Sequence, residues 1–484
     1  MQRNVAFLGN TYYTENKFSE NKFNIIYGEL DMFVGREKEL VKLRQVINTD
    51  KKEAVLIYGK RRIGKSTLIA EAAKDFDGIT IEHVCVKSTF EGNLELLNRD
   101  VSMALGLPDM HLTSLSDIFR FLSAQDKPVL IVLDEYQYMK ESAKKGEVDS
   151  YMQEVIDHMA DNIRLILCGS YISVMKELLE EENPLFGRFT SIMHIEEFDY
   201  YDAALFYPDA DTRSKIIYYA LFGGSPYVLS TIDTHISVEE NIKKFLIPST
   251  GVLRMYIENV MLREIGKAYD VRIFEIIGNG KKKYSDIKSG VTKDDNGLLS
   301  KQLKNLTDME TIAKTFPINR PDDKKKSFYV IKDNLMRFYF TFLFGNDGVI
   351  SRIGDDAFYR QFVDGRLVEF ISRRFEDIVL QYFGRLARTG QRRDFQDIGS
   401  YWYYDPANKK NGEFDCVVKS SAGYEFYECK FYQNPMTEQE CRDEEEQLKE
   451  IPGKSPAIIG FVCSSGFDFK SDRYSMITGE DLFS

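Results

Sequence analysis

The chain of 484 residues has few metal-binding or redox-active side chains, with five histidines and six cysteines. So small a number of histidines argues against a metal site built from imidazole groups. No two cysteines form a C-x-x-C pair, and several of the six lie in segments that we expect to be core strands. We therefore expect reduced, buried thiols in a cytoplasmic protein.

Long apolar runs are also absent from the sequence. No stretch approaches the ~20 consecutive apolar residues that a membrane-spanning helix needs. The N-terminus lacks the basic and then apolar layout of a signal peptide. We therefore expect no association with a membrane.

The chain is acidic as a whole, with a formal net charge of −12, which argues against a surface that coats nucleic acid generally. Exposed charges farther apart than a Debye length of ~8 Å barely interact at physiological salt, so local patches matter more than the total. Residues 278–332 carry 13 Lys and Arg against 7 Asp and Glu. This segment therefore has a local positive charge.

A glycine-rich loop is the most specific motif in the sequence. Residues 59–66 read GKRRIGKS, which fits the pattern G-x-x-x-x-G-K-[ST] of nucleotide phosphate-binding loops. The apolar run Ala54–Tyr58 before it predicts a strand, and the residues from Lys65 to about Lys74 predict a helix. A strand before the loop and a helix after it are the context that this motif requires.

The chemistry of phosphate binding explains the spacing of the loop. Gly59 and Gly64 let the backbone curl so that several N–H groups point at one anion. Lys65 supplies a mobile charge for the β- and γ-phosphates, and the Ser66 hydroxyl is a Mg²⁺ ligand. Thr67 bonds an α-phosphate oxygen or caps the helix. Lys60, Arg61 and Arg62 add positive charge to the loop or are simply solvated, and Ile63 completes its backbone.

Two acids follow a second buried strand. The apolar run Val129–Leu133 shows no alternation, which is typical of a parallel strand buried on both faces. Asp134 is then placed to hold the water shell of Mg²⁺, and Glu135 is placed to polarise an attacking water. The next strand ends at Ser170, which either senses the γ-phosphate or forms a plain turn. The pair of acids predicts nucleotide hydrolysis rather than binding alone.

Changes in pattern divide the chain into five parts. Strand and helix patterns alternate from Glu37 to Ile195, which predicts an α/β fold with a three-layer parallel sheet of the P-loop NTPase type. The predicted parts are a flexible tail at 1–31, the nucleotide-hydrolysing core at 32–199, a helical lid at 200–265, a winged helix-turn-helix at 266–335 and a C-terminal α/β domain at 336–484.

The predicted winged helix-turn-helix depends on the order of its elements. Two short helices precede an amphipathic helix at 296–306, with Leu298, Leu299, Leu303 and Leu306 on one side. A β-ribbon at 311–316 and 327–332 follows, around a polar loop. In such a motif the helix at 296–306 would enter the major groove of DNA and Lys324–Lys326 would form the wing tip. The alternative is a small packing module with a solvated basic face.

A second candidate catalytic site lies in the C-terminal domain. Asp415 is on one predicted strand and Glu428 and Lys430 are on the next, where residues two apart share a face. Two adjacent carboxylates repel unless a cation lies between them, and Mg²⁺ would also position a nucleophilic water. This D…E-x-K arrangement is typical of nucleases. Glu376 could be a further metal ligand and Gln447 could orient the water. The alternative is a structural salt bridge in an inactive relic.

The motifs together resemble the archaeal-type AAA-related ATPases, also called DEXX-box ATPases. The resemblance covers nearly everything after Met32. Its motifs are F-V-G-R-E at 33–37, the phosphate loop at 59–67, D-E-x-Q at 134–137, G-S at 169–170, G-R at 187–188 and G-G-x-P at 223–226.

The resemblance implies further roles for individual residues. It places Gly35 and Arg36 near the adenine and implies that the nucleotide is ATP, because residue chemistry alone does not separate ATP from GTP. It also implies that Arg188 is an arginine finger, which would act across a subunit boundary of a homo-oligomer. The alternative for Arg188 is a salt bridge within the chain.

The C-terminal domain resembles the restriction-endonuclease-like nucleases of the PD-(D/E)XK type. The matching motifs are E-x-D at 413–415 and E-C-K at 428–430. The segment Ser400–Tyr403 departs from the pattern, where we would expect a strand richer in tryptophan. The departure does not affect the acids.

Two functional hypotheses follow. The first is an ATP-controlled enzyme that binds DNA through residues 278–332 and the C-terminal domain and cuts it with Mg²⁺. The second is a nucleotide-dependent signalling or regulatory switch with an inactive nuclease-like domain. The intact Asp415, Glu428 and Lys430 favour the first, and the acidic total charge slightly favours the second.

Overall fold

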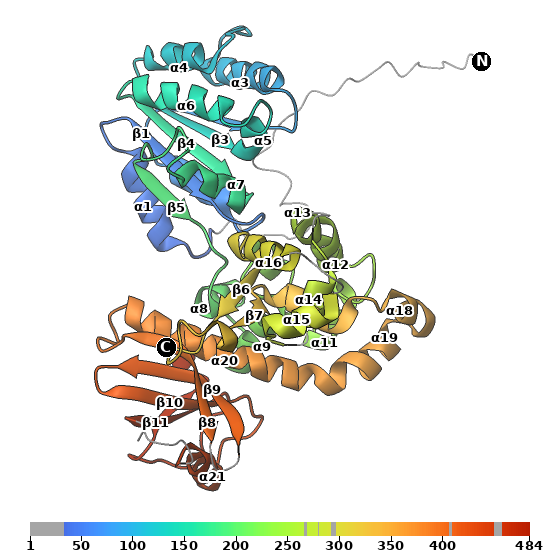
Figure 1. The fold of residues 1–484 in the computed structure, drawn as a ribbon. Helices are drawn as coiled ribbons and strands as arrows, with labels where there is room; N and C mark the ends of the chain where they lie inside the picture. Colours follow the sequence, from blue (N-terminus) through green and yellow to red (C-terminus); the bar gives the residue numbers. More distant parts are fainter. Residues whose placement is uncertain (1–32, 266–268, 279, 292–296, 406–408, 450–456) are drawn as a thin grey trace, which may run out of the picture. The chain divides into compact units, whose positions relative to one another are not determined.

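Five apolar strands form the first sheet of the protein. A computed structural model of the chain describes residues 33–265, 269–278, 280–291, 297–405, 409–449 and 457–484. The predicted tail at 1–31 lies outside the described residues. All neighbouring strands of the sheet are parallel, in the order β2-β3-β4-β1-β5 (Figure 1). The strands are β1 (Glu53–Tyr58), β2 (Ile79–Val84), β3 (Val129–Asp134), β4 (Ile163–Gly169) and β5 (Ser191–His194).

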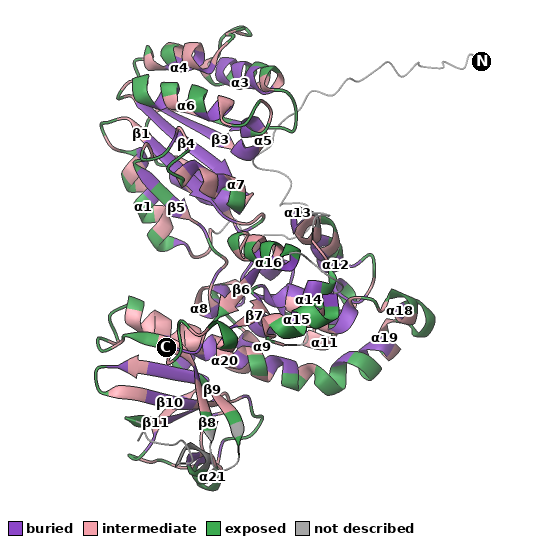
Figure 2. Cartoon of the chain, viewed as in Figure 1, coloured by how far each residue is buried: buried purple, intermediate pink, exposed green. Residues whose placement is uncertain are grey.

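Burial of these strands explains their continuous apolar sequences. All of β4 and all but the first residue of β1 are buried, as Figure 2 shows in purple. Because the strands are parallel, the segments that follow β1, β3 and β4 begin at the same edge of the sheet. That edge therefore gathers the phosphate loop, the acids after β3 and Ser170.

Helices alternate with these strands along the chain. The three helices α3, α4 and α6 share one apolar core with the sheet, through residues such as Leu97, Ile118 and Met152. Thr89 and Ser114 begin α3 and α4 by accepting backbone N–H bonds, the usual role of a helix N-cap. The helices are α1 (Glu37–Ile47), α2 (Lys65–Ala73), α3 (Phe90–Leu105), α4 (Leu115–Ser123), α5 (Tyr136–Lys140), α6 (Glu147–His158) and α7 (Ile172–Lys176).

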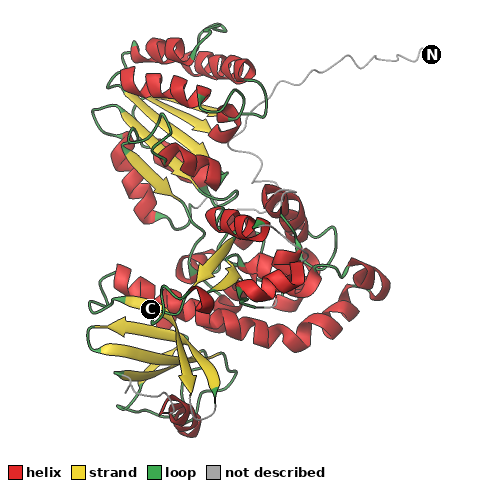
Figure 3. Cartoon of the chain, in the orientation of Figure 1, coloured by secondary structure: helices red, strands yellow, loops and turns green. Residues whose placement is uncertain are grey.

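The predicted lid consists of short helices, as Figure 3 shows in red. Gly223, with φ of 74°, ends α9, and Pro226 begins α10. The helices are α8 (Tyr200–Ala203), α9 (Thr212–Phe222), α10 (Pro226–Leu229), α11 (Val238–Phe245), α12 (Val252–Tyr256) and α13 (Leu262–Ile265), with a π-helical segment at Ile257–Met261.

The region predicted as a winged helix-turn-helix has the expected order of elements. Three helices, α14 (Arg272–Gly278), α15 (Tyr284–Val291) and α16 (Leu298–Asp308), precede an antiparallel pair of strands, β6 (Ile312–Thr315) and β7 (Phe328–Ile331). One detail of the prediction is wrong. Leu299, Leu303 and Leu306 are buried, but Leu298 is 56% exposed because it begins the helix and lies off the apolar face.

The C-terminal region is built on a mixed sheet in the order β12-β11-β10-β9-β8. Strands β8 (Asp397–Asp405), β9 (Lys410–Ser420) and β10 (Gly423–Lys430) are antiparallel neighbours. Strands β11 (Ile458–Cys463) and β12 (Ser475–Thr478) run parallel to β10, and α21 (Glu438–Lys449) lies between β10 and β11 in the chain.

Helices precede this mixed sheet in the chain. The long α20 contributes Phe375, Ile378 and Val379 to a core that also contains Val418 and Tyr427 of the sheet. The preceding helices are α17 (Asn334–Phe338), α18 (Asp347–Ile353), α19 (Asp355–Phe358) and α20 (Gly365–Arg388), with π-helical segments at Tyr339–Leu343 and Tyr359–Asp364.

The six cysteines are all free thiols, and five of them are buried, as expected; Cys429 is half-buried. Within the described ranges, no helix combines the length and the apolar content that a membrane crossing requires.

Candidate active site

The loop between β1 and α2 has the backbone shape that its two glycines permit. Gly59 has φ of 155° and Gly64 has φ of 88°, a region that favours glycine. A Cβ atom on Gly59 would lie 2.1 Å from the carbonyl oxygen of Ile195, so no side chain fits there. The loop therefore passes tightly over the segment that follows β5.

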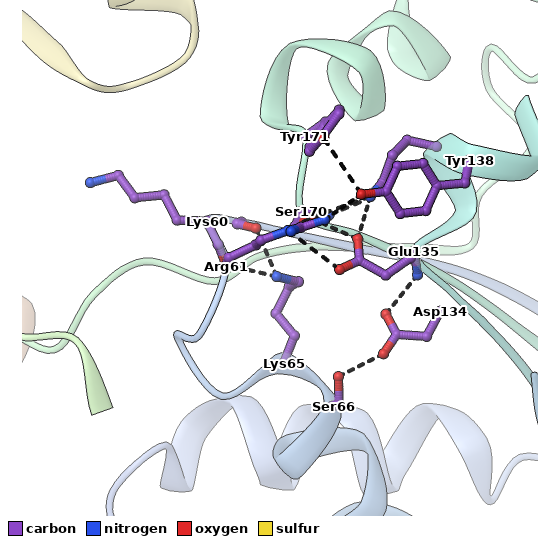
Figure 4. Close-up of polar contacts among 11 residues, drawn as sticks. Lys60, Arg61, Lys65, Ser66, Asp134, Glu135, Tyr138, Ser170 and Tyr171 are labelled. Atoms are coloured by element: carbon purple, nitrogen blue, oxygen red, sulfur yellow. Dashed lines mark hydrogen bonds and ion pairs between the residues drawn. The ribbon is translucent and has the colours of Figure 1, made fainter. Parts of the chain in front are cut away.

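Lys65 and Ser66 lie at the start of α2, where the loop ends. The Lys65 Nζ atom donates to the carbonyl oxygens of Gly59 and Lys60 at 2.8 and 2.7 Å, which holds it within the loop. The Ser66 hydroxyl donates to Oδ2 of Asp134 at 2.6 Å (Figure 4). The structure thus brings together the hydroxyl and the carboxylate that were predicted to hold Mg²⁺, although they lie 68 positions apart.

The carboxylate of Glu135 is held by several hydrogen-bond donors. Its backbone has φ of 53°, and its N–H donates to Oδ1 of Asp134 at 2.8 Å. Its Oε2 atom accepts from the Ser170 hydroxyl at 2.7 Å and from the side-chain amide of Gln137. Ser170 is buried, and its N–H donates to Oε1 of Gln137 at 3.3 Å. Glu135 and Ser170, predicted separately, are therefore direct partners.

Arg61 reaches the same group of residues from the phosphate loop. Its Nε atom lies 3.3 Å from the Ser170 hydroxyl and 3.6 Å from Oε1 of Glu135. Its Nη2 atom donates to the hydroxyl of Tyr138, and its guanidinium lies 5.6 Å from the ring centre of Tyr171 (Figure 4). Sequence reasoning did not select Tyr138 and Tyr171, which no motif marks. The D-E-x-Q spacing could have identified Gln137.

The other two basic residues of the loop have different partners. The guanidinium of Arg62 lies 4.0 Å from the ring centre of Tyr227 and 5.0 Å from that of Tyr256, both in the predicted lid. The Nζ atom of Lys60 lies 2.8 Å from Oε1 of Glu197. Burial alone would lower the pKa of Lys60, but the charges of Glu197 and Asp333 and the hydrogen bond to Glu197 together outweigh it and raise that pKa.

Arg36 links the phosphate loop to the segment that follows β5. The Arg36 guanidinium donates to the carbonyl oxygens of Ile63, at 3.3 Å, and of Glu196, and it lies 4.2 Å from the ring centre of Phe198. Ile63 is buried, whereas Thr67 is exposed on α2. The predicted position of Gly35 and Arg36 beside an adenine stays a prediction.

Arg188 forms an ion pair within its own chain. Its Nε and Nη2 atoms lie 2.9 and 3.1 Å from the two carboxylate oxygens of Asp157, and Nη1 donates to the carbonyl oxygen of Pro184 at 2.8 Å. The hydrogen bonds from Arg188 lower the pKa of Asp157. A role as an arginine finger would require this pair to open, and it stays a prediction.

The second candidate site brings most of its predicted residues close together. The register of β9 and β10 pairs Cys416 with Tyr427, so Asp415 and Glu428 follow in opposite positions. Burial and then the charge of Asp415 raise the pKa of Glu376, on α20, to about 8. Burial likewise raises the pKa of Glu428. Three carboxyl groups therefore interact at this place, while the side chain of Gln447 lies outside the described residues.

Two lysines offset the negative charge of this second site. The Nζ atom of Lys281 lies 2.9 Å from Oδ1 of Asp415 and 3.0 Å from Oε2 of Glu413. The Nζ atom of Lys430 lies 2.9 Å from Oε1 of Glu428 and 2.6 Å from Oε1 of Glu444. Sequence reasoning did not select Lys281 or Glu444, because neither belongs to the E-x-K motif.

A tighter group of possible metal ligands lies elsewhere. Across the described parts of the chain, the group whose ligand atoms all lie within 4.8 Å of one another is His194, Glu196 and Glu310. Lys176 lies 2.7 Å from Glu310 and Lys332 lies 3.8 Å from it. Burial would raise the pKa of Glu310, but His194 and Lys176 lower it to about 2. The charge of Glu310 is therefore already compensated by protein groups.

The predicted wing tip is partly engaged by the protein itself. Lys326 lies 3.7 Å from the ring centre of Trp402, which is the range of a cation–π interaction. Asn319 also donates to the carbonyl oxygen of Trp402 at 2.7 Å. The loop between β6 and β7 thus packs against strand β8.

Two parts of the chain match known protein families. Residues 33–232 match a family described as an ATPase domain found predominantly in Archaea. Residues 339–444 match a family of archaeal and bacterial proteins of unknown function. The first match covers the sheet, the phosphate loop, the two acids and Ser170, which supports ATPase activity for this part of the chain.

Individual relatives are more distant. An uncharacterised protein of Methanocaldococcus jannaschii is 28% identical over 77% of this chain and 82% of its own length. The Walker-type ATPase of Pyrococcus abyssi is 19% identical over 64% of this chain and 96% of its own, with a TM-score of 0.47. The ORC2 protein of Aeropyrum pernix, solved with ADPNP and ADP, is 13% identical over 66% of this chain and 94% of its own, with a TM-score of 0.42.

Proposed function

We propose that this protein binds ATP at the loop 59–67 and hydrolyses it. The observation that carries the proposal is the hydrogen bond between the Ser66 hydroxyl and Asp134, beside Glu135 and Ser170. A hydroxyl and a carboxylate are hard oxygen donors of the kind that Mg²⁺ prefers. Ser66 and Asp134 would hold the ion, which when bound neutralises charge on the β- and γ-phosphates.

The residues of the chain then divide the remaining work. The N–H groups of the loop and Lys65 bind the phosphates, and Ser170 orients the terminal one. Glu135 orients a water molecule for in-line attack on the γ-phosphorus and polarises it. Arg36, which is tied to the carbonyl of Ile63, keeps the loop in register with the sheet.

Nucleotide binding by a Lys65→Ala variant tests the proposal. We expect the parent to bind ATP in the presence of Mg²⁺ and the variant to lose binding, because Lys65 supplies the charge that neutralises the phosphates. Titration calorimetry measures both. Lys51→Ala, which removes an exposed lysine just before β1, should bind like the parent. Tight ATP binding by Lys65→Ala would exclude the loop as the nucleotide site.

A second proposed activity is Mg²⁺-dependent cleavage of DNA at Glu376, Asp415, Glu428 and Lys430. Its support is the mutual charge interaction of three carboxyl groups from α20, β9 and β10. Lys430 would stabilise the charge that develops on the phosphate. Residues 278–332 would bind DNA as a winged helix-turn-helix. The alternative is a nucleotide-dependent switch in which this domain binds a partner without cutting.

The proposal includes a role for Arg188 in a homo-oligomer. Its side chain is 30% exposed, and its pair with Asp157 is on the surface, where such pairs contribute little to stability. A neighbouring subunit could therefore draw Arg188 toward its own γ-phosphate at little cost.

A further inference from the structure

Two hydrogen-bond donors and one cation, from three different elements, converge on the carboxylate of Glu135. Ser170 follows β4, Gln137 lies on α5, and Arg61 lies in the phosphate loop. Ser170 and Gln137 both donate to Oε2, and the Nε atom of Arg61 lies 3.6 Å from Oε1 (Figure 4). Both carboxylate oxygens therefore face protein donors.

This arrangement limits what Glu135 can do for a water molecule. A carboxylate polarises water by accepting its hydrogen through an oxygen lone pair. Here Oε2 accepts from Ser170 and Gln137, and Oε1 lies beside the charge of the Arg61 guanidinium. Oε1 is therefore the oxygen left for the attacking water, and an acceptor that draws the guanidinium away would leave Oε1 to that water alone.

The γ-phosphate of ATP is such an acceptor. A terminal phosphate has three strongly accepting oxygens and carries up to about two negative charges. A guanidinium suits phosphate as well as carboxylate, because its fork of N–H groups matches both. Arg61 lies two positions after Gly59, inside the loop that encloses the phosphates. ADP offers no γ-phosphate to compete.

We propose that Arg61 is a ligand of the γ-phosphate supplied by the chain's own loop, and that its transfer from Glu135 to that phosphate makes the site distinguish ATP from ADP. The inference rests on the nucleotide site proposed above. Arg61 is then a positioning residue for Glu135 as well as a ligand. This role is separate from that of an arginine finger such as Arg188, which would come from another subunit.

The neighbours of Arg61 support this role. Tyr138 accepts a hydrogen bond from Nη2, and Tyr171 lies under the guanidinium, so the side chain is directed along the carboxyl edge of the sheet. The adjacent Arg62 is directed to Tyr227 and Tyr256 of the lid. The two arginines thus leave the loop in different directions, and Arg61 is the one that meets Glu135 and Ser170.

The experiment compares two nucleotides on the full chain. Titration calorimetry with Mg²⁺ measures the affinity for ADP and for the non-hydrolysable analogue ADPNP, in the parent, Arg61→Ala and Arg61→Lys. We expect Arg61→Ala to lose about tenfold or more in ADPNP affinity, as for a hydrogen bond to a charged group. ADP affinity should stay within about twofold, because ADP lacks the γ-phosphate. Arg61→Lys should recover part of the loss, since it restores the charge without the fork.

A control variant and the comparison of ADP with ADPNP separate this role from a structural one. Arg120→Ala removes a 77% exposed arginine of the same domain and should bind both nucleotides like the parent. An equal loss of ADP and ADPNP affinity in Arg61→Ala would overturn the proposal, because it would mean that Arg61 only shapes the loop. Unchanged affinity for both would overturn it as well. Absence of ATP turnover by the parent would contradict the proposed hydrolysis and leave this binding comparison decisive for Arg61.

Discussion

Asp333, which is buried, and Glu197, which is half-buried, form a pair of carboxyl groups next to Lys60 of the phosphate loop. A hydrogen bond joins the two carboxyl groups, and Lys60 pairs with Glu197. Burial and then the charge of Glu197 raise the pKa of Asp333 to about 7. Asp333 also begins α17 by accepting the N–H of Met336 at 2.8 Å. A protonated Asp333 thus donates to Glu197 while its other oxygen caps a helix.

This pair predicts a pH-dependent stability. Because the pKa of Asp333 is raised in the folded protein, its contribution is fully present below the pKa of the unfolded chain and is lost as the pH rises through about 7. Asp333→Asn keeps the cap and donates to Glu197 at every pH. The free energy of unfolding of the variant, measured relative to that of the parent, should rise by roughly 2 kcal/mol as the pH rises from 5 to 8. Thermal and chemical unfolding at several pH values measure the difference.

Asp322→Asn is the matched control, because Asp322 is exposed in the loop between β6 and β7. Its difference from the parent should not change across this pH range. A constant difference for Asp333→Asn as well would mean that Asp333 does not titrate in the folded protein near neutral pH.

Motif spacing predicted individual site residues better than it predicted their contacts. Ser66 and Asp134 were predicted to share one ion, and the structure places the Ser66 hydroxyl 2.6 Å from Oδ2 of Asp134. The contact of Arg61 with Glu135 was not predicted. It depends on β1 lying next to β4, and β4 next to β3, and that order is set by packing of whole strands. Local sequence carries no signal for it.

At the scale of elements, the turn between α9 and α10 packs tightly against the segment that follows β5. Gly224 accepts the N–H of Phe198 at 2.9 Å. A Cβ atom on Gly224 would lie 1.9 Å from the carbonyl oxygen of Phe198, and this neighbour is backbone that cannot rotate away. The glycine of the G-G-x-P motif is thus required by close packing.

Gly224→Ala should therefore destabilise the protein by about 1–3 kcal/mol, the usual cost of overpacking. Denaturant unfolding gives this number. Gly365→Ala is the control, since Gly365 is exposed at the start of α20 and a Cβ atom there would meet nothing within 4 Å. Equal stability of the two variants would contradict the assigned role of Gly224.

A long apolar pattern predicts an element closely. The apolar spacing at 364–386 continues over many turns and predicts a helix, and α20 spans Gly365–Arg388 there. Strand β12 has no such pattern. Its four residues are too few to show alternation, and its pairing with β11 is a long-range contact. Leu298 was assigned to the wrong face because a helix begins less regularly than it continues.

At the scale of the whole molecule, the protein has two candidate catalytic sites on two different sheets. Lys281 shows why their relation could not be read from the sequence. It precedes Asp415 by 134 positions, yet their charged atoms lie 2.9 Å apart. No motif links the two residues, so the contact depends on how the regions around α15 and β9 pack.

Separate sites predict separable activities. If the proposed cleavage occurs, Asp415→Ala should reduce Mg²⁺-dependent cutting of plasmid and linear DNA to background, because it removes a carboxylate of the proposed metal site. ATP turnover should stay like that of the parent. Asp468→Ala, which removes an exposed carboxylate of the same region, should keep both activities. Cleavage that persists in Asp415→Ala would exclude this site, and no cleavage by the parent would favour the nucleotide-dependent switch.

Steady-state turnover of ATP by the parent and by Glu135→Gln tests most directly whether Glu135 activates the attacking water. The amide keeps the size of the side chain but cannot polarise water as a carboxylate does. We expect Glu135→Gln to bind ATP with near-parental affinity and to hydrolyse it at least about a hundredfold more slowly. Glu141→Gln, a change on the exposed end of α5, should turn over like the parent. Full ATP turnover by Glu135→Gln would show that Glu135 does not activate the attacking water.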